Sequence, residues 1–360
     1  MRTAIILKTF PPDVIGGMET QTKRMGTELS KAGHDVTVFT KRYGEHTDSD
    51  VPYDVVRVRN WQLTPFISDL TFLIFALHTL LRRHDEFDIL QCMMIYPTGF
   101  LGYVVNKLTS LPYFAWIRGG DYYLMNDVWW KRWMMRRVLE DTLVLAQSAE
   151  IREDVRTDFD DIDCDIDVLG NAVSIPDKTA DGNGVLYVGR LAPKKGLGYL
   201  IDAIADVDAH LTVVGDGSER DRLEARAAET SADVTFIGEV PPNEVDEFYR
   251  DAAVFVLPSI EGEGMPNVVL EAMAWGLPVV ATESGGLPTV IDDGTTGYIV
   301  PMRDAEALEN SITELVTDPV KREQMGTTAR VKMQEDRSWD WLVAELEDVY
   351  RRARAEERKR

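Results

Sequence analysis

Short runs rich in Val, Ile, Leu and Phe alternate with stretches of helical periodicity along most of the chain. The first series of runs is TAIILKTF, HDVTVFT, FDILQCM and LPYFAWIRGG, and the second is GVLYVGR, AHLTVVGDG, ADVTFIGEV, AAVFVLPS and GLPVVATESGG. Between the first two runs a helix is expected from about Met18 to Ala32, and Gly33 ends it. Strands alternating with helices form βαβ units, and nearly continuous apolar strands are covered on both faces. The pattern predicts an α/β protein with two parallel sheets.

The two series are separated by residues 158–184, a stretch rich in Asp, Gly and Pro. This composition predicts a boundary between a first domain at 1–169 and a second at 170–337. The last segment, 338–360, has apolar residues at helical spacing behind Ser338 as the N-cap, which predicts an amphipathic closing helix that packs toward the first domain. The run DDIDCDID within the boundary is interpreted as an acidic, solvated linker and not as a metal site.

The length of 360 residues and the hydrophobic content of 44% fit two folded domains. Two cysteines are too few for a disulfide framework or a zinc site and suit a reducing cytoplasm. The apolar run Ala4 to Leu7 is interpreted as a first strand and not as a signal peptide. The run Leu70 to Leu81 is shorter than the ~20 residues of a membrane span, so a buried or interfacial helix is expected there. We therefore expect a cytoplasmic protein, peripheral at the inner face of the cell membrane.

The net charge of −22 is distributed unevenly. Residues 1–140 hold 17 Lys and Arg against 15 Asp and Glu, whereas residues 141–360 hold 22 against 46. Such acidity is typical of a halophilic source and argues against nucleic acid as a partner. The near-neutral first part contains WWKRWMMRR at 129–137, which either contacts an anionic membrane or forms a structural helix that buries Trp129, Trp130 and Trp133.

Loops after the expected strands hold the candidate binding residues, because ligands of open parallel sheets bind beyond the carboxyl ends of the strands. Gly16 and Gly17 precede the first helix and let backbone N–H groups face a phosphate. Arg190 and Lys195 follow the run GVLYVGR and place two cations where a diphosphate fits. On their own, glycine pairs and surface cations are also common in turns and on solvated surfaces.

The stretch EGEGMPNVVLEAMAWG, residues 261–276, sets a glycine loop against the start of a helix. Glu271 lies one turn inside that helix, on a face that can point toward the ligand. Because a carboxylate repels phosphate, Glu271 is suited to neutral hydroxyls such as those of ribose, and Glu263 on the loop to a second hydroxylated ring. Taken alone, both are also compatible with solvated glutamates.

The pattern around these carboxylates resembles that of the retaining family-four glycosyltransferases, which have the two-domain GT-B architecture. The resemblance rests on Glu263-x7-Glu271 followed by AMAWGLPVV, together with GNAV, VGRLAPKKG, VVGDG, FIGEV and GGLPTVI, and it covers nearly the whole chain. It implies two Rossmann-like domains that face a central crevice. The first domain would bind the acceptor and the second the nucleotide sugar.

The resemblance also implies roles for single residues. Arg190 and Lys195 would hold the donor diphosphate and stabilise the charge that develops on it, and Glu271 would bind the ribose. Glu263 and the backbone amides of Gly264, Met265, Pro266 and Asn267 would contact the donor sugar; among these amides, that of proline has no N–H to donate. Gly238, Glu239 and Val240 would line the base, and Gly16 and Gly17 would close on the phosphate. Metal ions and cofactors are not implied.

Two positions depart from the family pattern. Where many members have His-Gly-x-Asp, this chain has Arg118, Gly119, Gly120 and Asp121; Arg118 and Asp121 are therefore retained as candidate catalytic contacts without the role of that His. The Glu that usually follows Gly-Gly-x-Pro is Thr289.

The expected function is transfer of a sugar from a nucleoside-diphosphate sugar to a hydroxyl of a lipid-linked or envelope glycan. Three alternatives remain. A sugar-nucleotide epimerase or a phosphorylase can share the architecture, and a catalytically silent nucleotide-sugar-binding subunit fits the loss of the His. A dinucleotide-dependent oxidoreductase is disfavoured, because VGDGSER has Arg220 where the third glycine of Gly-x-Gly-x-x-Gly is required.

Overall fold

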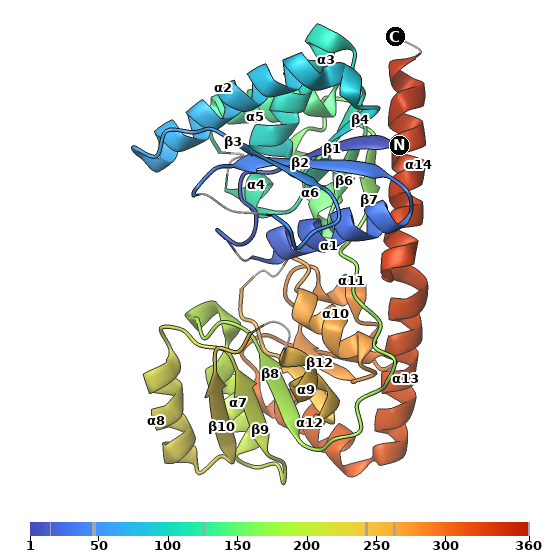
Figure 1. Ribbon diagram of the computed structural model, residues 1–360. Coiled ribbons are helices and arrows are strands. Elements are labelled where there is room, and N and C mark those ends of the chain that lie inside the picture. Colours follow the sequence, from blue (N-terminus) through green and yellow to red (C-terminus); the bar gives the residue numbers. More distant parts are fainter. Residues whose placement is uncertain (15, 45–47, 125–126, 242–243, 262–263, 359–360) are drawn as a thin grey trace. The chain divides into compact units, whose positions relative to one another are not determined.

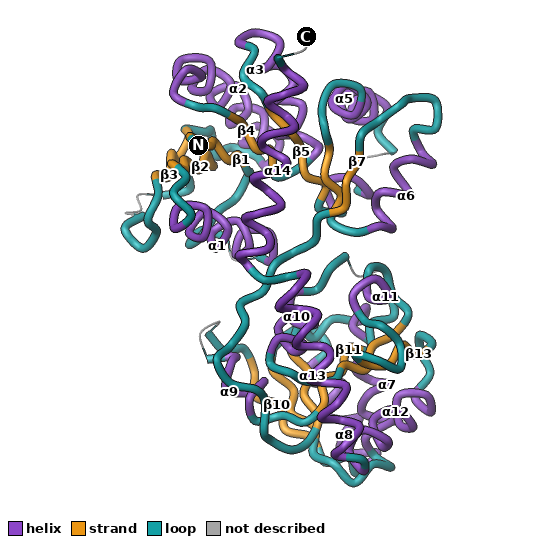
Figure 2. Tube along the Cα trace, turned by 90° about the vertical axis from the view of Figure 1, so that its right-hand side faces the viewer, coloured by secondary structure: helices purple, strands orange, loops and turns teal. Residues whose placement is uncertain are grey.

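The computed structural model describes residues 1–360 except 15, 45–47, 125–126, 242–243, 262–263 and 359–360. It divides into two compact units, the first formed by Met1–Asn171 with Trp339–Arg360 and the second by Ala172–Ser338. These limits differ by one or two residues from the boundaries expected from the sequence. In each unit, helices flank the strands of a sheet (Figure 2).

The sheet of the first unit is seven-stranded and parallel, in the order β3-β2-β1-β4-β5-β6-β7 (Figure 1). Its strands are β1 (Arg2–Ile6), β2 (Asp35–Lys41), β3 (Asp54–Val58), β4 (Ile89–Cys92), β5 (Tyr113–Ile117), β6 (Val144–Ala146) and β7 (Ile166–Val168). Its helices are α1 (Gly17–Lys31), α2 (Pro65–Arg83), α3 (Phe100–Thr109), α4 (Gly120–Tyr123), α5 (Trp129–Leu139), α6 (Ala149–Asp158) and α14 (Trp339–Glu357), with short helical turns η1 (His84–Glu86) and η2 (Ile95–Gly99).

Local sequence explains where the main helices begin and end. Helix α1 ends at Lys31 because Gly33 adopts a positive φ of 86°, which suits glycine. Helix α2 begins after Thr64, whose side chain accepts a hydrogen bond from the amide of Ile67, and Pro65 occupies its first position. Alternate residues of the strands face opposite layers, so one face of the sheet packs on α2, α3 and α5, and the other on α1 and α14.

Helix α14 belongs to the first unit. Tyr350 is fully buried, and its hydroxyl donates a hydrogen bond to Gln91 Oε1 at 2.8 Å. Its ring lies 5.8 Å from that of Phe114 on β5, and Glu347 contacts His34 Nε2 at 3.0 Å. The apolar stripe of the closing helix therefore packs on β4 and β5, at the end of α1.

The sheet of the second unit is six-stranded and parallel, in the order β10-β9-β8-β11-β12-β13. Its strands are β8 (Val185–Val188), β9 (Leu211–Val214), β10 (Val234–Gly238), β11 (Val254–Leu257), β12 (Val279–Thr282) and β13 (Gly297–Val300). Its helices are α7 (Leu197–Ile204), α8 (Arg220–Thr230), α9 (Val245–Arg250), α10 (Asn267–Ala274), α11 (Leu287–Val290), α12 (Ala305–Thr317) and α13 (Pro319–Asp336), with the turn η3 (Pro193–Lys195). Strands β8, β11 and β12 are fully buried, as their continuous apolar runs predict. For β10 the expected burial on both faces is wrong, because it is an edge strand whose residues before Gly238 alternate between half-buried and exposed.

The interpretation of DDIDCDID as a solvated linker is wrong for its second half. Ile166–Val168 forms β7, the edge strand of the first sheet, and pairs with β6. Asp165 and Asp167 form ion pairs with Arg352 of α14. The acidic residues are therefore placed on a short edge strand, where charge also discourages pairing with another chain.

Candidate active site

Each sheet has one point at which the direction of strand addition reverses. In the second unit it lies between β8 and β11, which are parallel neighbours while the remaining strands are added outward on either side. In the first unit it lies between β1 and β4. The loops at the carboxyl ends of such a strand pair diverge, and open α/β sheets bind ligands there.

Arg190 and Lys195 lie in the loop between β8 and α7. Gly196 has a φ of 67°, and a Cβ at this position would lie 2.1 Å from the carbonyl oxygen of Pro258, so only glycine lets this loop pack against the end of β11. The amide of Ile260 donates a hydrogen bond to the carbonyl of Lys194 at 2.8 Å. The loop with the two cations is thus joined to the loop that leads into α10.

Glycines also hold the neighbouring loops together. Gly215 has a φ of 129°, and its Cα lies so near Gly189 that an added Cβ would be 2.0 Å from the Gly189 oxygen. Its amide donates to the carbonyl of Gly238 at 2.8 Å. The carboxyl end of β10 at Gly238 is therefore joined to the loop after β9; that Gly238, Glu239 and Val240 line the base stays a prediction.

Glu271 projects from α10 and is held by a residue that the sequence analysis did not identify. Tyr249 of α9 is 1% exposed, and its hydroxyl donates to Glu271 Oε2 at 2.8 Å. Burial raises the pKa of Glu271, and the hydrogen bond from Tyr249 acts in the opposite direction. A positioned carboxylate of this kind accepts hydrogen bonds from hydroxyl groups. The segment FYRDAAVFV shows no pattern that would predict a buried tyrosine hydroxyl.

The N-terminus of α10 follows the glycine loop. Pro266 is its N-cap, and no described side chain caps this end. Met265 is buried in the core of the second unit, whereas the preceding Gly264 is exposed to solvent. Amides at a helix start that has no side-chain cap suit oxygen ligands. Glu263 lies outside the described residues, so its predicted contact with the donor sugar stays a prediction.

In the first unit, Gly16 and Gly17 lie at the start of α1. A Cβ on Gly16 would lie 2.5 Å from Glu19 Oε2, so the glycine allows this carboxylate to approach the backbone. Glu19 is 8% exposed and accepts a hydrogen bond from Thr9, in the loop after β1. The sequence gives no signal that sets Glu19 apart, because an acidic residue in the first turn of a helix is common and stabilises the helix dipole.

Arg118 and Asp121 lie after β5. Asp121 is 4% exposed, and its two oxygens accept hydrogen bonds from the amides of Arg118 at 2.8 Å and Ile95 at 2.7 Å. Burial raises the pKa of Asp121 to about 6, although both amides favour the ionised form. Its carboxylate thus holds the loops after β4 and β5 together.

The Arg118 guanidinium faces several groups. Its Nη2 donates to Asn171 Oδ1 at 2.7 Å, and it lies 4.6 Å from the ring centroid of Trp116. Its Nε is buried and has no hydrogen-bond partner among the described residues. Burial lowers the pKa of Arg118 to about 10, against the effects of Asp121 and Glu19, so the group stays charged at neutral pH.

The segment WWKRWMMRR forms α5, but it does not bury all of its tryptophans. Trp129 is 80% exposed and Trp133 47% exposed, whereas the Trp130 ring lies 5.9 Å from that of Tyr96. The alternative of a structural helix that buries all three is therefore wrong. The neighbouring Leu124 is also exposed, at 76%.

The other departure from the family pattern, Thr289, lies in α11 of the second unit. Its hydroxyl donates a hydrogen bond to the carbonyl of Gly286, the N-cap of the same helix, at 2.6 Å.

Two family models match consecutive parts of the chain. The model described as Glycosyltransferase Family 4 matches residues 15–175, and the model described as Glycosyl transferases group 1 matches residues 174–332. The chain belongs to the family-four glycosyltransferases. The resemblance inferred from the motifs is thereby confirmed.

Similar proteins agree with this assignment. The glycosyltransferase is 26% identical to an uncharacterized glycosyltransferase of Methanocaldococcus jannaschii, over 98% of each chain. It is 32% identical to the phosphatidyl-myo-inositol mannosyltransferase of Mycobacterium leprae, over 59% of this chain and 54% of that protein. The solved structure of HepE of Anabaena in complex with UDP matches with a TM-score of 0.77 at 18% identity, over 97% of this chain and 99% of that chain. The fold is GT-B, as predicted.

The loop that holds Arg190 and Lys195 is thus hydrogen-bonded to the loop that leads into α10, the helix that holds Glu271. Among the described residues, no group of three or more His, Cys, Asp or Glu side chains is arranged to hold a metal ion.

Proposed function

We propose that this glycosyltransferase transfers a sugar from a nucleoside-diphosphate sugar to a hydroxyl of a lipid-linked or envelope glycan, with retention of the anomeric configuration and without a metal ion. The observation that supports it most is the hydrogen bond between the Ile260 amide and the Lys194 carbonyl. It joins the loop that holds Arg190 and Lys195 to the loop that leads to Glu271. One bound nucleoside diphosphate can therefore contact both cations and the carboxylate.

In the proposed reaction the bond between the anomeric carbon and the diphosphate oxygen breaks, and a bond to the acceptor oxygen forms on the same face of the sugar. The proton of the acceptor hydroxyl passes to the leaving diphosphate. Negative charge grows on the leaving diphosphate, and Arg190 and Lys195 stabilise it. Glu271 accepts hydrogen bonds from the ribose hydroxyls, and Gly238, Glu239 and Val240 line the base. Glu263 and the backbone of Gly264 to Asn267 orient the donor sugar, and Gly16 and Gly17 approach the phosphate.

The acceptor side of the proposal is supported by the first unit. Helix α2 together with the turn η1, Pro65–Glu86, is 22 residues long and is apolar enough to cross a membrane by length and composition alone, although the apolar run Leu70 to Leu81 within it is shorter than a span. Its exposed apolar residues, and those of α5, suit contact with an anionic membrane surface. The relative from Mycobacterium leprae is named for a phosphatidyl-inositol substrate, and HepE was solved with UDP. We place the enzyme at the cytoplasmic face of the membrane.

The test is release of nucleoside diphosphate from a panel of UDP-, GDP- and ADP-sugars, at high salt, with and without a membrane lipid extract. Release from one donor that depends on the extract supports transfer. Conversion of the donor sugar without any acceptor would instead identify an epimerase. Donor binding without release under any condition would identify a silent subunit, the alternative that Arg118 in place of the family His favours.

A further inference from the structure

A large cavity lies in the first unit, beside the carboxyl ends of β1, β4 and β5. Its volume is about 820 Å³, within the ~300–1,000 Å³ of small-molecule sites. Its walls are mainly apolar and come from three helices, with Leu73 and Leu77 from α2, Phe100 and Val104 from α3, and Trp130 and Met134 from α5. The sheet below it changes direction between β1 and β4, so the cavity occupies the position at which this fold binds ligands.

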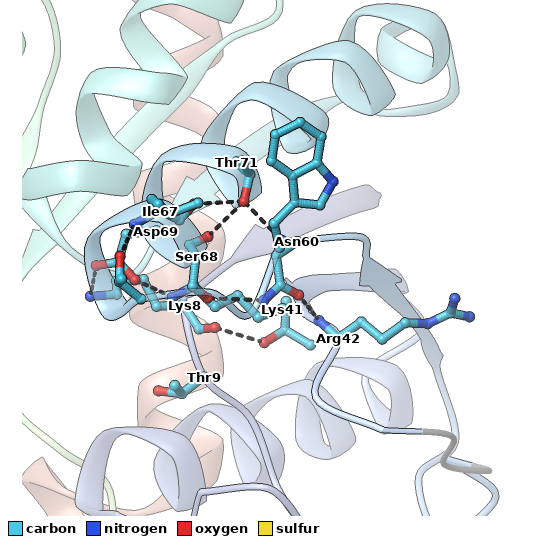
Figure 3. A network of polar contacts seen from close by, with 12 residues as sticks. Lys8, Thr9, Lys41, Arg42, Asn60, Ile67, Ser68, Asp69 and Thr71 are labelled. Atoms are coloured by element: carbon cyan, nitrogen blue, oxygen red, sulfur yellow. Dashed lines mark hydrogen bonds and ion pairs between the residues drawn. The ribbon is translucent and has the colours of Figure 1, made fainter.

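Helix α2 is fixed in an orientation that leaves one apolar stripe uncovered. Asp69 forms ion pairs with Lys8 at 2.6 Å and with Lys41 (Figure 3). The Thr71 hydroxyl accepts a hydrogen bond from the Trp61 amide at 2.9 Å. These contacts, with the fully buried Phe72, Ala76 and Leu80 on its inner face, prevent the helix from turning its remaining apolar side inward.

That remaining side borders the cavity and reaches the surface. Phe66, Leu70 and Ile74 line the cavity, yet they are 69%, 46% and 56% exposed. Leu124, also a lining residue, is 76% exposed. An exposed apolar stripe beside an open apolar cavity marks a binding site for a hydrophobic ligand. A polar sugar or nucleotide would not provide the apolar contacts that these walls can make.

The cavity also has a charged wall. Lys8, Arg118 and Lys131 line it, together with Asp69 and Asp121. Asp69 is paired with two lysines, and Asp121 accepts two backbone amides, so both carboxylates have partners. The Arg118 Nε is buried without a hydrogen-bond partner among the described residues. The charged wall therefore suits a ligand with one anionic group at the end of its hydrocarbon chain.

We propose that this cavity binds the acceptor of the reaction by its hydrocarbon chain, and that the acceptor is a glycan carried on a single-chain alkyl or isoprenoid phosphate, whose phosphate lies beside Arg118 and whose glycan hydroxyl receives the sugar. The chain enters past Phe66, Leu70 and Ile74 and fills the space between α2, α3 and α5. This inference rests on the proposed function, because it names the acceptor class and the residues that select it.

The first test is calorimetric binding of butyl, octyl and dodecyl phosphate below their micelle concentrations. Affinity is expected to rise two- to fourfold for each added methylene, as transfer of apolar surface from water requires. Val104→Trp fills the cavity and is expected to weaken dodecyl phosphate at least tenfold and to flatten the dependence on chain length. Leu108→Trp, on the same helix but 63% exposed and not in the cavity wall, is the matched control and should bind as the wild type does.

A second variant guards against a folding defect. Met134→Trp narrows the cavity from the opposite wall, on α5, and should reproduce the loss. Thermal unfolding and nucleotide binding by the second unit report whether either variant is folded. Arg118→Gln should weaken dodecyl phosphate more than dodecanol, because dodecanol lacks the anionic group. Unchanged chain-length dependence in both folded cavity variants would overturn the inference.

The outcomes separate this inference from the proposed function. Binding of dodecyl phosphate that the cavity variants abolish, with no sugar transfer to any acceptor, would retain the cavity and refute the transfer reaction. The opposite outcome is sugar transfer at the same rate to short- and long-chain acceptors, in both wild type and Val104→Trp. That outcome would support the transfer reaction and refute the cavity as the acceptor site. Flotation with phosphatidylglycerol vesicles tests whether bulk phospholipid occupies the cavity instead. If it does, Val104→Trp should lose co-flotation. If membrane contact is made by the exposed Trp129 and Trp133, Val104→Trp should still co-float.

Discussion

The two units place their binding groups at the same topological position but differ in what they present there. At the β8/β11 position, the second unit has two cations, a held carboxylate and glycines that bring loop backbones together. At the β1/β4 position, the first unit has an apolar cavity with one charged wall. The strand order sets where a ligand binds, whereas the side chains of the surrounding loops and helices set which ligand it is.

The charge distribution follows the same division. The second unit, residues 172–338, holds 30 Asp and Glu against 14 Lys and Arg, whereas the first unit, residues 1–171 and 339–360, holds 31 against 25. Most charged side chains of the second unit are acidic and would repel a diphosphate. Arg190 and Lys195 supply the positive charge that the proposed diphosphate site requires. The first unit binds its ligand mainly through apolar area, so its affinity should depend little on salt.

The largest expected effect is that of Glu271→Gln in the second unit. Hydrogen bonds to a charged group contribute ~1.5–3 kcal/mol, so losing the carboxylate should lower kcat/KM by ~10- to 150-fold. Because burial raises the pKa of Glu271, the ionised side chain destabilises the fold, and the variant should unfold at the same or a higher temperature. Nucleotide release and thermal unfolding measure the two effects.

Glu247→Gln, at an exposed position on α9, is the control for Glu271→Gln and should be neutral in both measurements. A Glu271→Gln enzyme with normal kcat/KM would remove Glu271 from the donor site. Binding of dodecyl phosphate to the first unit should be unchanged in either variant, which would sharpen the division between the two units.

The next effect compares adjacent lysines in η3. Lys195→Ala should lower kcat/KM at least ~10-fold, because a cation that stabilises the leaving diphosphate is lost. Lys194→Ala should stay within about twofold, because Lys194 is exposed and contacts the α10 loop through its carbonyl, which alanine retains. Steady-state kinetics with a saturating acceptor distinguishes them. Equal losses in both variants would show that local charge, and not the position of Lys195, is what matters.

Much of the fold could be predicted from the sequence, and the exceptions have a physical reason. The apolar runs of β1, β2, β4, β5 and β8 to β12 predict strands, although β10 is an edge strand with half-buried and exposed residues in alternation. Strands β3, β6, β7 and β13 were not predicted. Strands β6 and β7 are only three residues long, and β3, β7 and β13 lie at sheet edges, where burial on both faces is not required.

The candidate site divides in the same way. Arg190, Lys195 and Glu271 were named as candidates because glycines and strand ends mark the loops in or beside which they lie, and their roles stay predictions. Tyr249 was not, because nothing in its neighbours shows that its hydroxyl meets Glu271. The cavity was also not predicted, since Phe66, Leu70 and Ile74 have the same helical spacing whether they face a core or an opening.

A smaller effect is expected at the surface of the first unit. Trp129→Ala with Trp133→Ala removes two exposed rings from α5 and should reduce co-flotation with vesicles that contain phosphatidylglycerol about fivefold, because Trp suits the membrane interface. Ile237→Ala, at an exposed apolar position of the second unit, is the control and should float as the wild type does. If both variants float equally, membrane contact is not confined to α5.

The most specific effect is on the pH dependence of stability of the first unit. Burial raises the pKa of Asp121 from 3.8 to about 6, so between these values the folded state binds more protons than the unfolded state. The contribution of Asp121 to stability is therefore greatest below pH 4 and falls, by on the order of 2–3 kcal/mol, as the pH rises to about 6.

Asp121→Asn should flatten this part of the profile, measured by urea unfolding between pH 4 and 7. It should also lower stability overall, because an amide group would face one of the two backbone N–H donors, Ile95 or Arg118. An unchanged slope in the variant would mean that Asp121 stays ionised throughout, held by those two amides.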